Sequence, residues 1–419
     1  MTSGQLTTSS SRLMASMAIS LGVLTSACGP PESVSPTSYS SPYIYGSYYV
    51  ESPMPVSASL AGTLVTWWYH TDTNGLYNGY AALAFDLVVG DNIGIGSLFP
   101  PVPGSPVQGP PVMSAVADDG YILTAGDGFL RALDPVGHSW WSVPLGALAT
   151  TSVAIASDGT TYVGDEGGVF YAFTSAGDPF WATGLGATPY GHPAIAQDGS
   201  IWFAARHLDG TWTLYGLESS GEVRTAFPLD VAVASPSIDQ EGHVLIPVYG
   251  GDANDNPADP DLFMLSSFDM KDGLRWQAPT HGQAYAAVVG QDGTLYVAAQ
   301  AWDEPGHLLA LSPDDGAEVW RTDLEGDVWQ PAVLDNGLLV VGCGAALCGY
   351  HLKSGKEAFA WPSSTSVTGV FGPPLAMDGV IVATTSYGFY AWEMGGRVNT
   401  ETRSWARLGS DNALTGRAP

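Results

Sequence analysis

The chain repeats a unit of about forty residues along most of its length, and this repeat restricts the fold more than any other feature. The clearest copy reads QDGTLYV at residues 291–297, GHLLAL at 306–311 and GAEVW at 316–320. The glycine of the first turn recurs at positions 120, 159, 199, 242, 293, 337 and 379, and a divergent first copy begins at residue 60. The chain therefore contains about eight copies of one supersecondary unit.

Each unit is typical of short antiparallel strands joined by tight turns. Asp-Gly between β-rich runs favours a hairpin turn, because glycine adopts a positive φ without a Cβ clash. Runs such as LLAL suit strands that neighbouring sheets cover on both faces. One four-stranded sheet cannot bury both faces alone, whereas a ring of sheets can. The sequence predicts an all-β fold, a β-propeller of about eight four-stranded blades, with the recurring tryptophan packed between blades. Seven blades is the alternative, because the first unit is divergent.

The combination of DGTLYV, a later LAL and a G-x-x-x-W ending resembles the repeat of the quinoprotein-like (PQQ-repeat) β-propellers. That family includes the pyrroloquinoline-quinone (PQQ) dehydrogenases and an outer-membrane assembly lipoprotein of the same shape. The resemblance covers residues 57–409, and residues 405–416 resemble a segment at the edge of such propellers. The motif is specific for the fold and discriminates poorly between functions.

The N-terminal residues read as an export signal. Arg12 precedes an apolar run at residues 13–24, which is too short to span a bilayer and fits the apolar part of a secretory signal. The run ends in LTSAC at residues 24–28, which resembles the lipobox of bacterial lipoproteins, although Thr25 stands where Leu or Val is commoner. We expect Cys28 to be lipidated. The alternative is an ordinary cleaved signal with a chance cysteine.

These features divide the chain into four segments. We predict a signal peptide at 1–27, the lipidated cysteine with a Pro/Ser/Tyr-rich tether at 28–56, the propeller at 57–409 and a C-terminal tail at 410–419. The protein is expected to be exported to the periplasm or cell surface. Gly29 follows the cysteine where Asp would retain a lipoprotein at the inner membrane, so the outer membrane is favoured.

Acidic residues greatly outnumber basic ones. Asp and Glu total 41 against 13 Lys and Arg, a formal net charge of −28. Such a chain repels phosphate backbones, so we expect no nucleic-acid partner. Anionic lipid surfaces are repelled too, so we expect contact with a membrane only through the lipid anchor.

Three cysteines are present, and lipidation of Cys28 leaves an even pair, Cys343 and Cys348. In an oxidising compartment this pair predicts a disulfide across a hairpin. The alternative is two free buried thiols. No histidine cluster accompanies the two cysteines, so a zinc site is not expected.

One insert departs from the repeat and explains the long gap between the turns at Gly242 and Gly293. It reads GDANDNPADPD at residues 251–261. Closely spaced carboxylate and amide oxygens are the ligands that Ca²⁺ requires. The candidate calcium ligands are Asp252, Asn254, Asn256, Asp259 and Asp261. The alternative is an acidic, solvated loop, since the spacing is not that of an EF-hand.

Catalytic motifs are not evident. The sequence holds no G-x-S-x-G elbow, H-E-x-x-H pair or P-loop. The family's alcohol dehydrogenases commonly carry two adjacent cysteines beside the quinone, whereas Cys343 and Cys348 are separated. No catalytic residue of that family transfers to this chain. We therefore expect neither an enzyme nor a bound PQQ, and no cofactor apart from the candidate Ca²⁺.

The sequence thus predicts a cell-envelope lipoprotein whose propeller acts as a non-catalytic binding or scaffold module. The expected partner is an envelope protein or a glycan. One alternative is a PQQ-dependent or other enzyme with its site in the propeller channel. A second alternative is an outer-membrane protein assembly factor, by analogy at the level of the fold.

Overall fold

The computed structural model describes residues 57–58, 63–71, 77–86, 97–99, 112–126, 128–134, 138–232, 234–250, 259–362, 370–377, 379–385, 388–394 and 418. All of them belong to the unit Ser33–Pro419. Strands make up nearly all the regular structure of these residues, together with one 3-10 turn, η1 (Pro260–Leu262). Across the described ranges, no helix combines the length and apolar character that a membrane crossing needs.

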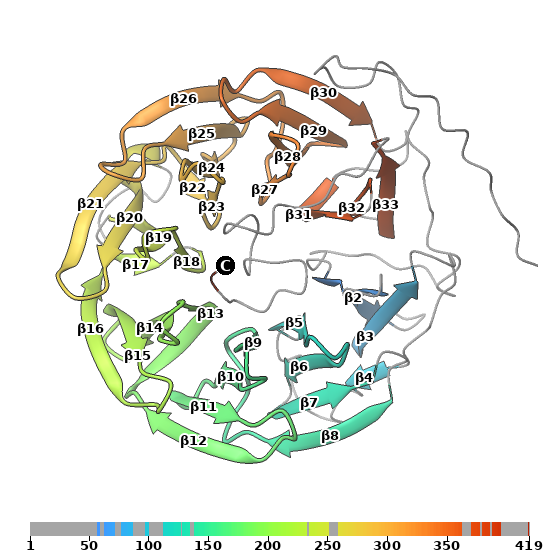
Figure 1. The fold of residues 1–419 in the computed structure, drawn as a ribbon, viewed down its shortest axis with the longest axis vertical. Coiled ribbons are helices and arrows are strands. Elements are labelled where there is room, and N and C mark those ends of the chain that lie inside the picture. The colour runs from blue at the N-terminus through green and yellow to red at the C-terminus, as the bar shows by residue number, and fades with distance from the viewer. Residues whose placement is uncertain are drawn as a thin grey trace, which may run out of the picture. The chain divides into compact units, whose positions relative to one another are not determined.

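The strands form eight antiparallel sheets, here called blades and numbered in chain order (Figure 1). The first blade contains β1 (Ser57–Ala58), β2 (Thr63–Thr71), β3 (Tyr77–Asp86) and β4 (Ser97–Phe99). The second contains β5 (Val112–Val116), β6 (Ile122–Gly126), β7 (Phe129–Leu133) and β8 (Ser139–Pro144). The third contains β9 (Ala154–Ile155), β10 (Thr161–Gly164), β11 (Val169–Phe173) and β12 (Pro179–Gly184). The fourth contains β13 (Ala187–Ile195), β14 (Ile201–His207), β15 (Trp212–Leu217) and β16 (Val223–Leu229).

The fifth blade contains β17 (Val231–Ala232), β18 (Ser237–Ile238), β19 (Val244–Tyr249), β20 (Phe263–Asp269) and β21 (Gly273–Pro279). The sixth contains β22 (Gln283–Ala284), β23 (Val288–Val289), β24 (Leu295–Gln300), β25 (His307–Leu311) and β26 (Glu318–Asp323). The seventh contains β27 (Ala332–Val333), β28 (Leu338–Cys343), β29 (Ala346–His351) and β30 (Glu357–Pro362). Of the eighth, β31 (Val370–Met377), β32 (Val380–Thr385) and β33 (Gly388–Glu393) are described.

Within each blade the strands pair in sequence order, from an inner first strand to an outer last strand (Figure 1). In the fifth and sixth blades the inner strand is interrupted, so that two short pieces pair with the same neighbour. Each of these two blades therefore still has four strand positions. The connections between the second and third strands lie at the same end of a blade as the connections from one blade to the next. We call this end the 2–3 face.

The hydrophobic core consists of clusters that each join neighbouring blades. One cluster includes Phe170 of the third blade and Phe203 of the fourth, whose rings stack with their centroids 4.2 Å apart. One further cluster joins the second blade to the third, and another runs through the fourth, fifth and sixth blades. Two more join the sixth blade to the seventh and the seventh to the eighth. From the second blade to the eighth, the described blades thus cover their neighbours, as the sequence pattern predicts.

The recurring tryptophan links one blade to the next. Trp181 on β12 donates its indole N–H to the carbonyl of Ser219 (2.8 Å), in the turn between β15 and β16 of the following blade. Gly221 closes that turn at φ +87°, and a Cβ there would lie 2.5 Å from Trp181 Cδ2. Trp141, Trp276 and Trp320 make the equivalent bonds to Ser175, Pro313 and Leu352. The predicted packing of this tryptophan between blades is confirmed.

The strand register explains why the LAL part of the repeat has a small residue at its centre. Ala172 pairs with Trp181, and Ala310 with Trp320, so a small residue lies across from each of these indoles. The register shifts immediately after each pair, at a β-bulge. The small residue leaves room for the indole, and the bulge adds twist to the outer strand.

Candidate functional site

A cavity of about 320 Å³ opens on the 2–3 face between the fifth and sixth blades. We call it the Trp302 pocket. Its lining consists of Ala234, Phe263, Gln283, Ala284, Tyr285, Gln300, Ala301, Trp302 and Asp303. These residues come from strand ends and connections of two blades, so the rigid sheets position the pocket wall.

The most prominent feature of the pocket is the turn that follows β24. Trp302 in this turn is 84% exposed. Asp303 adopts φ +60°, in the left-handed region that residues other than glycine seldom occupy. Glu304 N–H donates to the carbonyl of Ala301 (3.3 Å) and closes the turn. Asp is one of the few residues besides glycine that tolerate this conformation, as is common in a tight turn.

Gln300 is fixed at the base of this turn by three hydrogen bonds. Its Nε2 donates to the carbonyl of Glu304 (2.9 Å) and to Asp327 Oδ1 (2.7 Å). Its Oε1 accepts from Val328 N–H (3.2 Å). These bonds use both amide hydrogens and one of the two lone pairs of Oε1.

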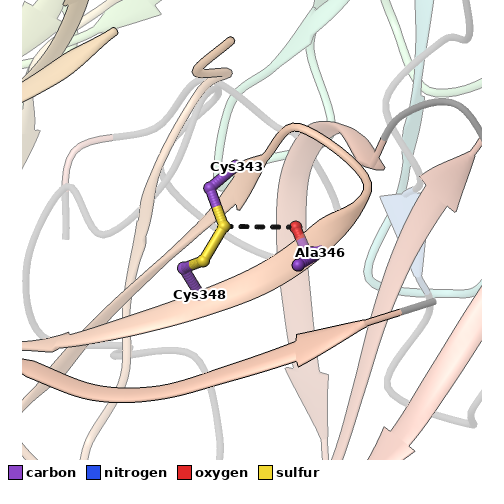
Figure 2. Close-up of a disulfide and its surroundings, with 3 residues drawn as sticks. All are labelled: Cys343, Ala346 and Cys348. Atoms are coloured by element: carbon purple, nitrogen blue, oxygen red, sulfur yellow. Dashed lines mark hydrogen bonds between the residues drawn. A yellow bond between two sulfur atoms is a disulfide. The ribbon is translucent and has the colours of Figure 1, made fainter. Parts of the chain in front are cut away.

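The Cys343–Cys348 disulfide supports the connection that holds Gln300. The two cysteines lie on β28 and β29, with their Cα atoms 6.0 Å apart, and Cys343 Sγ lies 3.5 Å from the carbonyl of Ala346 (Figure 2). Gly344 N–H in the same hairpin donates to the carbonyl of Asp327 (2.8 Å), and Cys343 forms a β-bridge with Val328. The disulfide hairpin therefore braces the residues that bind Gln300.

The connection between β21 and β22 leads directly to Gln283, which lines the pocket. Buried His307 lies with Nε2 2.8 Å from the carbonyl of Thr280, and Thr280 Oγ1 donates to the carbonyl of Gly282 (2.8 Å). Burial lowers the pKa of His307 below its ordinary value of 6.5. His281 adopts φ +52°, and its Nδ1 lies 3.5 Å from Asp261 Oδ1. This connection is thus held by side chains of both blades.

Tyr285 lies at the rear of the pocket and remains protonated at physiological pH. Burial, followed by the negative charge of Asp327, raises the pKa of Tyr285 to about 12. Its ring centroid lies 6.1 Å from that of Trp329. A protonated phenol can both donate and accept a hydrogen bond.

A second cavity of about 410 Å³ opens at the opposite end of the fourth and fifth blades. Arg224 pairs there with Asp198, and His243 Nδ1 lies 2.8 Å from Asp239 Oδ2. Ala418 also lines this cavity and donates its N–H to the carbonyl of Ile195 (2.6 Å). The charged groups named here are paired with one another, and a residue of the C-terminal segment takes part in the wall.

The residues predicted from the sequence are only partly described. Cys28, Asp252, Asn254 and Asn256 lie outside the described residues, so the lipidation and calcium predictions stay predictions. Asp259 accepts a hydrogen bond from Asp261 N–H (3.1 Å) at the start of η1, and Asp261 lies beside His281. Among the residues that the structure describes, no three His, Cys, Asp or Glu side chains form a group that could hold a metal ion.

The Trp302 pocket was not predicted from the sequence. A signal for it was present, because Trp302 lies in a turn and not at the position of the recurring tryptophan. His307 was also missed. It lies buried in β25.

Comparison with known proteins supports the fold. Residues 264–413, less than half of the chain, match the model of a family described as outer membrane protein assembly factor BamB. No curated protein sequence matches the chain.

The solved structures that are similar to this chain include three that cover most of it. BamB from Moraxella catarrhalis has a TM-score of 0.53 and 13% identity, covering 83% of this chain and 100% of that chain. The Dos1 propeller has a TM-score of 0.63 and 9% identity, covering 86% and 97%. Quinohemoprotein alcohol dehydrogenase from Comamonas testosteroni has a TM-score of 0.57 and 13% identity, covering 84% and 76%. At such low identities these likenesses show the fold alone.

The chain is therefore an all-β propeller, which confirms the predicted fold, and the match of residues 264–413 to a PQQ-repeat family model confirms the predicted resemblance. Its blades from β20 onward are similar to those of the BamB family.

Proposed function

We propose that this chain is a lipid-anchored, non-catalytic binding scaffold of the bacterial cell envelope. The observation that carries the binding part is the Trp302 pocket, where an exposed indole stands beside side chains fixed by hydrogen bonds. Pre-organised polar groups beside an aromatic surface are the usual composition of a binding site. The rigid blades reduce the entropy lost when a ligand binds.

The pKa shifts of the buried tyrosines and of His307 follow from packing within the described blades. Burial raises the pKa values of Tyr162, Tyr285, Tyr296 and Tyr350 to about 12 and lowers that of His307. A general acid or base works best with a pKa near the working pH, and these shifts move away from neutrality. They are the shifts of groups that pack and hydrogen-bond.

Export and anchoring rest on the N-terminal pattern, the apolar run at 13–24 followed by the lipobox-like 24–28. The match of residues 264–413 to the BamB family supports a place in the envelope. That match also favours a second candidate function, a role in outer-membrane protein assembly. Gly29 favours the outer membrane.

The lipid anchor and the non-catalytic assignment are both tested in the full-length protein. Wild type and Cys28→Ala are expressed in a bacterial host that is fed an alkyne fatty acid, and the membranes are separated. Wild type should carry the label and sediment with the outer membrane, and Cys28→Ala should do neither. Unlabelled wild type would overturn the anchor. Substrate-dependent dye reduction that requires added PQQ and Ca²⁺ would overturn the non-catalytic assignment.

A further inference from the structure

Trp302 is exposed for a reason that the strand pattern does not supply. Other large exposed residues, such as Trp140, Phe180 and Val319, directly precede the recurring tryptophan on an outer strand, where alternation turns them to solvent. Trp302 instead lies in a turn, 84% exposed, at the rim of a cavity. A flat indole in this position offers a stacking surface that the fold itself does not use.

The groups around the indole disfavour an anionic ligand. Gln283, Gln300 and Asp303 supply amide and carboxylate groups, and the lining that the structure describes contains no Lys or Arg. The chain has a net charge of −28, which disfavours phosphate or carboxylate ligands. Hydroxyl groups are the natural partners, because they donate to carboxylate and amide oxygens and accept from amide hydrogens.

Gln300 lines the pocket and is held rigidly, with its amide bonded toward the connection between the sixth and seventh blades. Its bonds to Glu304, Asp327 and Val328 fix the amide plane and leave one lone pair of Oε1 beyond those used. An acceptor held in this way keeps its orientation when the ligand leaves, so little entropy is lost on binding.

The size of the cavity restricts the ligand further. A volume of about 320 Å³ lies at the small end of ligand pockets and accommodates one or two sugar rings. A helical peptide would require a stripe of apolar anchors along a groove. The described lining has one exposed indole among amides, which does not match that requirement.

We propose that the Trp302 pocket binds a neutral saccharide, with the C–H face of one ring stacked on the Trp302 indole and its hydroxyls bonded to Gln300, Gln283 and Asp303. This assignment rests on the proposed binding function and names its ligand class. It applies equally to a free oligosaccharide and to the end of a surface glycan.

The test is isothermal titration of the full-length protein with cellobiose, maltose and N,N′-diacetylchitobiose, and with the anionic disaccharide digalacturonate. At least one neutral disaccharide should bind with a Kd below about 10 mM, and more tightly than digalacturonate. Trp302→Ala should weaken that binding by about tenfold or more, and Trp302→Phe should weaken it less. Binding of none of the neutral sugars, or tighter binding of digalacturonate, overturns the assignment.

Trp140→Ala is the matched control, since Trp140 is also exposed (52%) but lies on β8, on the outer edge of the second blade. It should bind as wild type does. Equal affinity of the Trp302→Ala and Trp140→Ala proteins would place the sugar elsewhere and overturn the proposal. Melting temperatures of the variants report their folding. Fatty-acid labelling and the quinone assay do not depend on the pocket, so failure of sugar binding is distinguishable from failure of the proposed function.

Discussion

The hydrogen bond from the recurring tryptophan to the next blade can be tested at the turn whose carbonyl accepts it. Gly221 closes the turn between β15 and β16 at φ +87°, and an added Cβ would lie 2.5 Å from Cδ2 of Trp181. Gly242 in the fifth blade adopts φ +90°, and an added Cβ there has no atom within 4 Å. The two glycines therefore share the backbone conformation and differ in the indole contact. Substitution of each by alanine separates the two effects.

The magnitudes follow from this difference. Both Gly221→Ala and Gly242→Ala pay the left-handed backbone cost, about 1–2 kcal/mol. Gly221→Ala in addition displaces the Trp181 ring, with an overpacking cost of about 1–3 kcal/mol. Loss of the indole bond to Ser219 adds about 1 kcal/mol. We expect Gly221→Ala to lower the free energy of unfolding by about 2–4 kcal/mol more than Gly242→Ala.

The assay is urea denaturation followed by far-ultraviolet circular dichroism. It is applied to Gly221→Ala, Gly242→Ala, Trp181→Ala and the double variant that combines Trp181→Ala with Gly221→Ala. In the Trp181→Ala background, Gly221→Ala should cost no more than Gly242→Ala does in wild type, because the clash is gone. Equal destabilisation by the two glycine variants in the wild-type background would refute the argument. The tryptophan would then be a filler of space and not a specific link between blades.

Three further predictions concern the surroundings of the pocket. Asp303→Val should lower the free energy of unfolding by about 1–2 kcal/mol, because a β-branched residue resists φ +60°, while Asp303→Gly should not lower it; equal losses in urea denaturation would contradict the strain argument. Burial lowers the pKa of His307 in the folded state below 6.5, so the unfolded chain binds more protons between the two pKa values. The free energy of unfolding should therefore show no His307-dependent change above pH 6.5, and it should fall as the pH drops from 6.5 through the folded-state pKa. His307→Gln should remove that part of the pH dependence in thermal melts. Reduction of Cys343–Cys348 should cost about 2 kcal/mol, as expected for a short closed loop, and a urea midpoint unaffected by reductant would show that the bond contributes nothing.

The repeat was sufficient to predict the blades, because its glycine, alanine and tryptophan each have the same structural role in one blade after another. The turn glycine adopts a positive φ, the alanine of LAL lies across from an indole, and the tryptophan bonds to the next blade. Such tasks depend on neighbours at fixed spacing along the chain. Periodicity therefore reports them even in a single sequence.

The pocket could not be predicted in the same way, since its parts are distant in the chain. Gln300 is held by Asp327 and Val328 of the next connection, and His281 lies beside Asp261 of the preceding blade. These contacts depend on how one blade is placed against the next, which spacing within a single repeat does not encode. The sequence offered only the tryptophan at residue 302, outside the repeat position.

The departures from the repeat indicate where function should be sought. The insert at 251–261 joins β19 to β20, the Trp302 turn joins β24 to β25, and the disulfide hairpin joins β28 to β29. All three connect second to third strands, in consecutive blades, and so lie at the same end of those blades. Bonds from Asp261 to the connection at His281, and from Gly344 to the connection at Asp327, tie them to the junctions between blades. A scaffold that only filled space would place its irregularities without regard to side, whereas these three all occur in connections between second and third strands. The 2–3 face of the fifth to seventh blades is therefore the surface on which we expect this protein to meet its ligand.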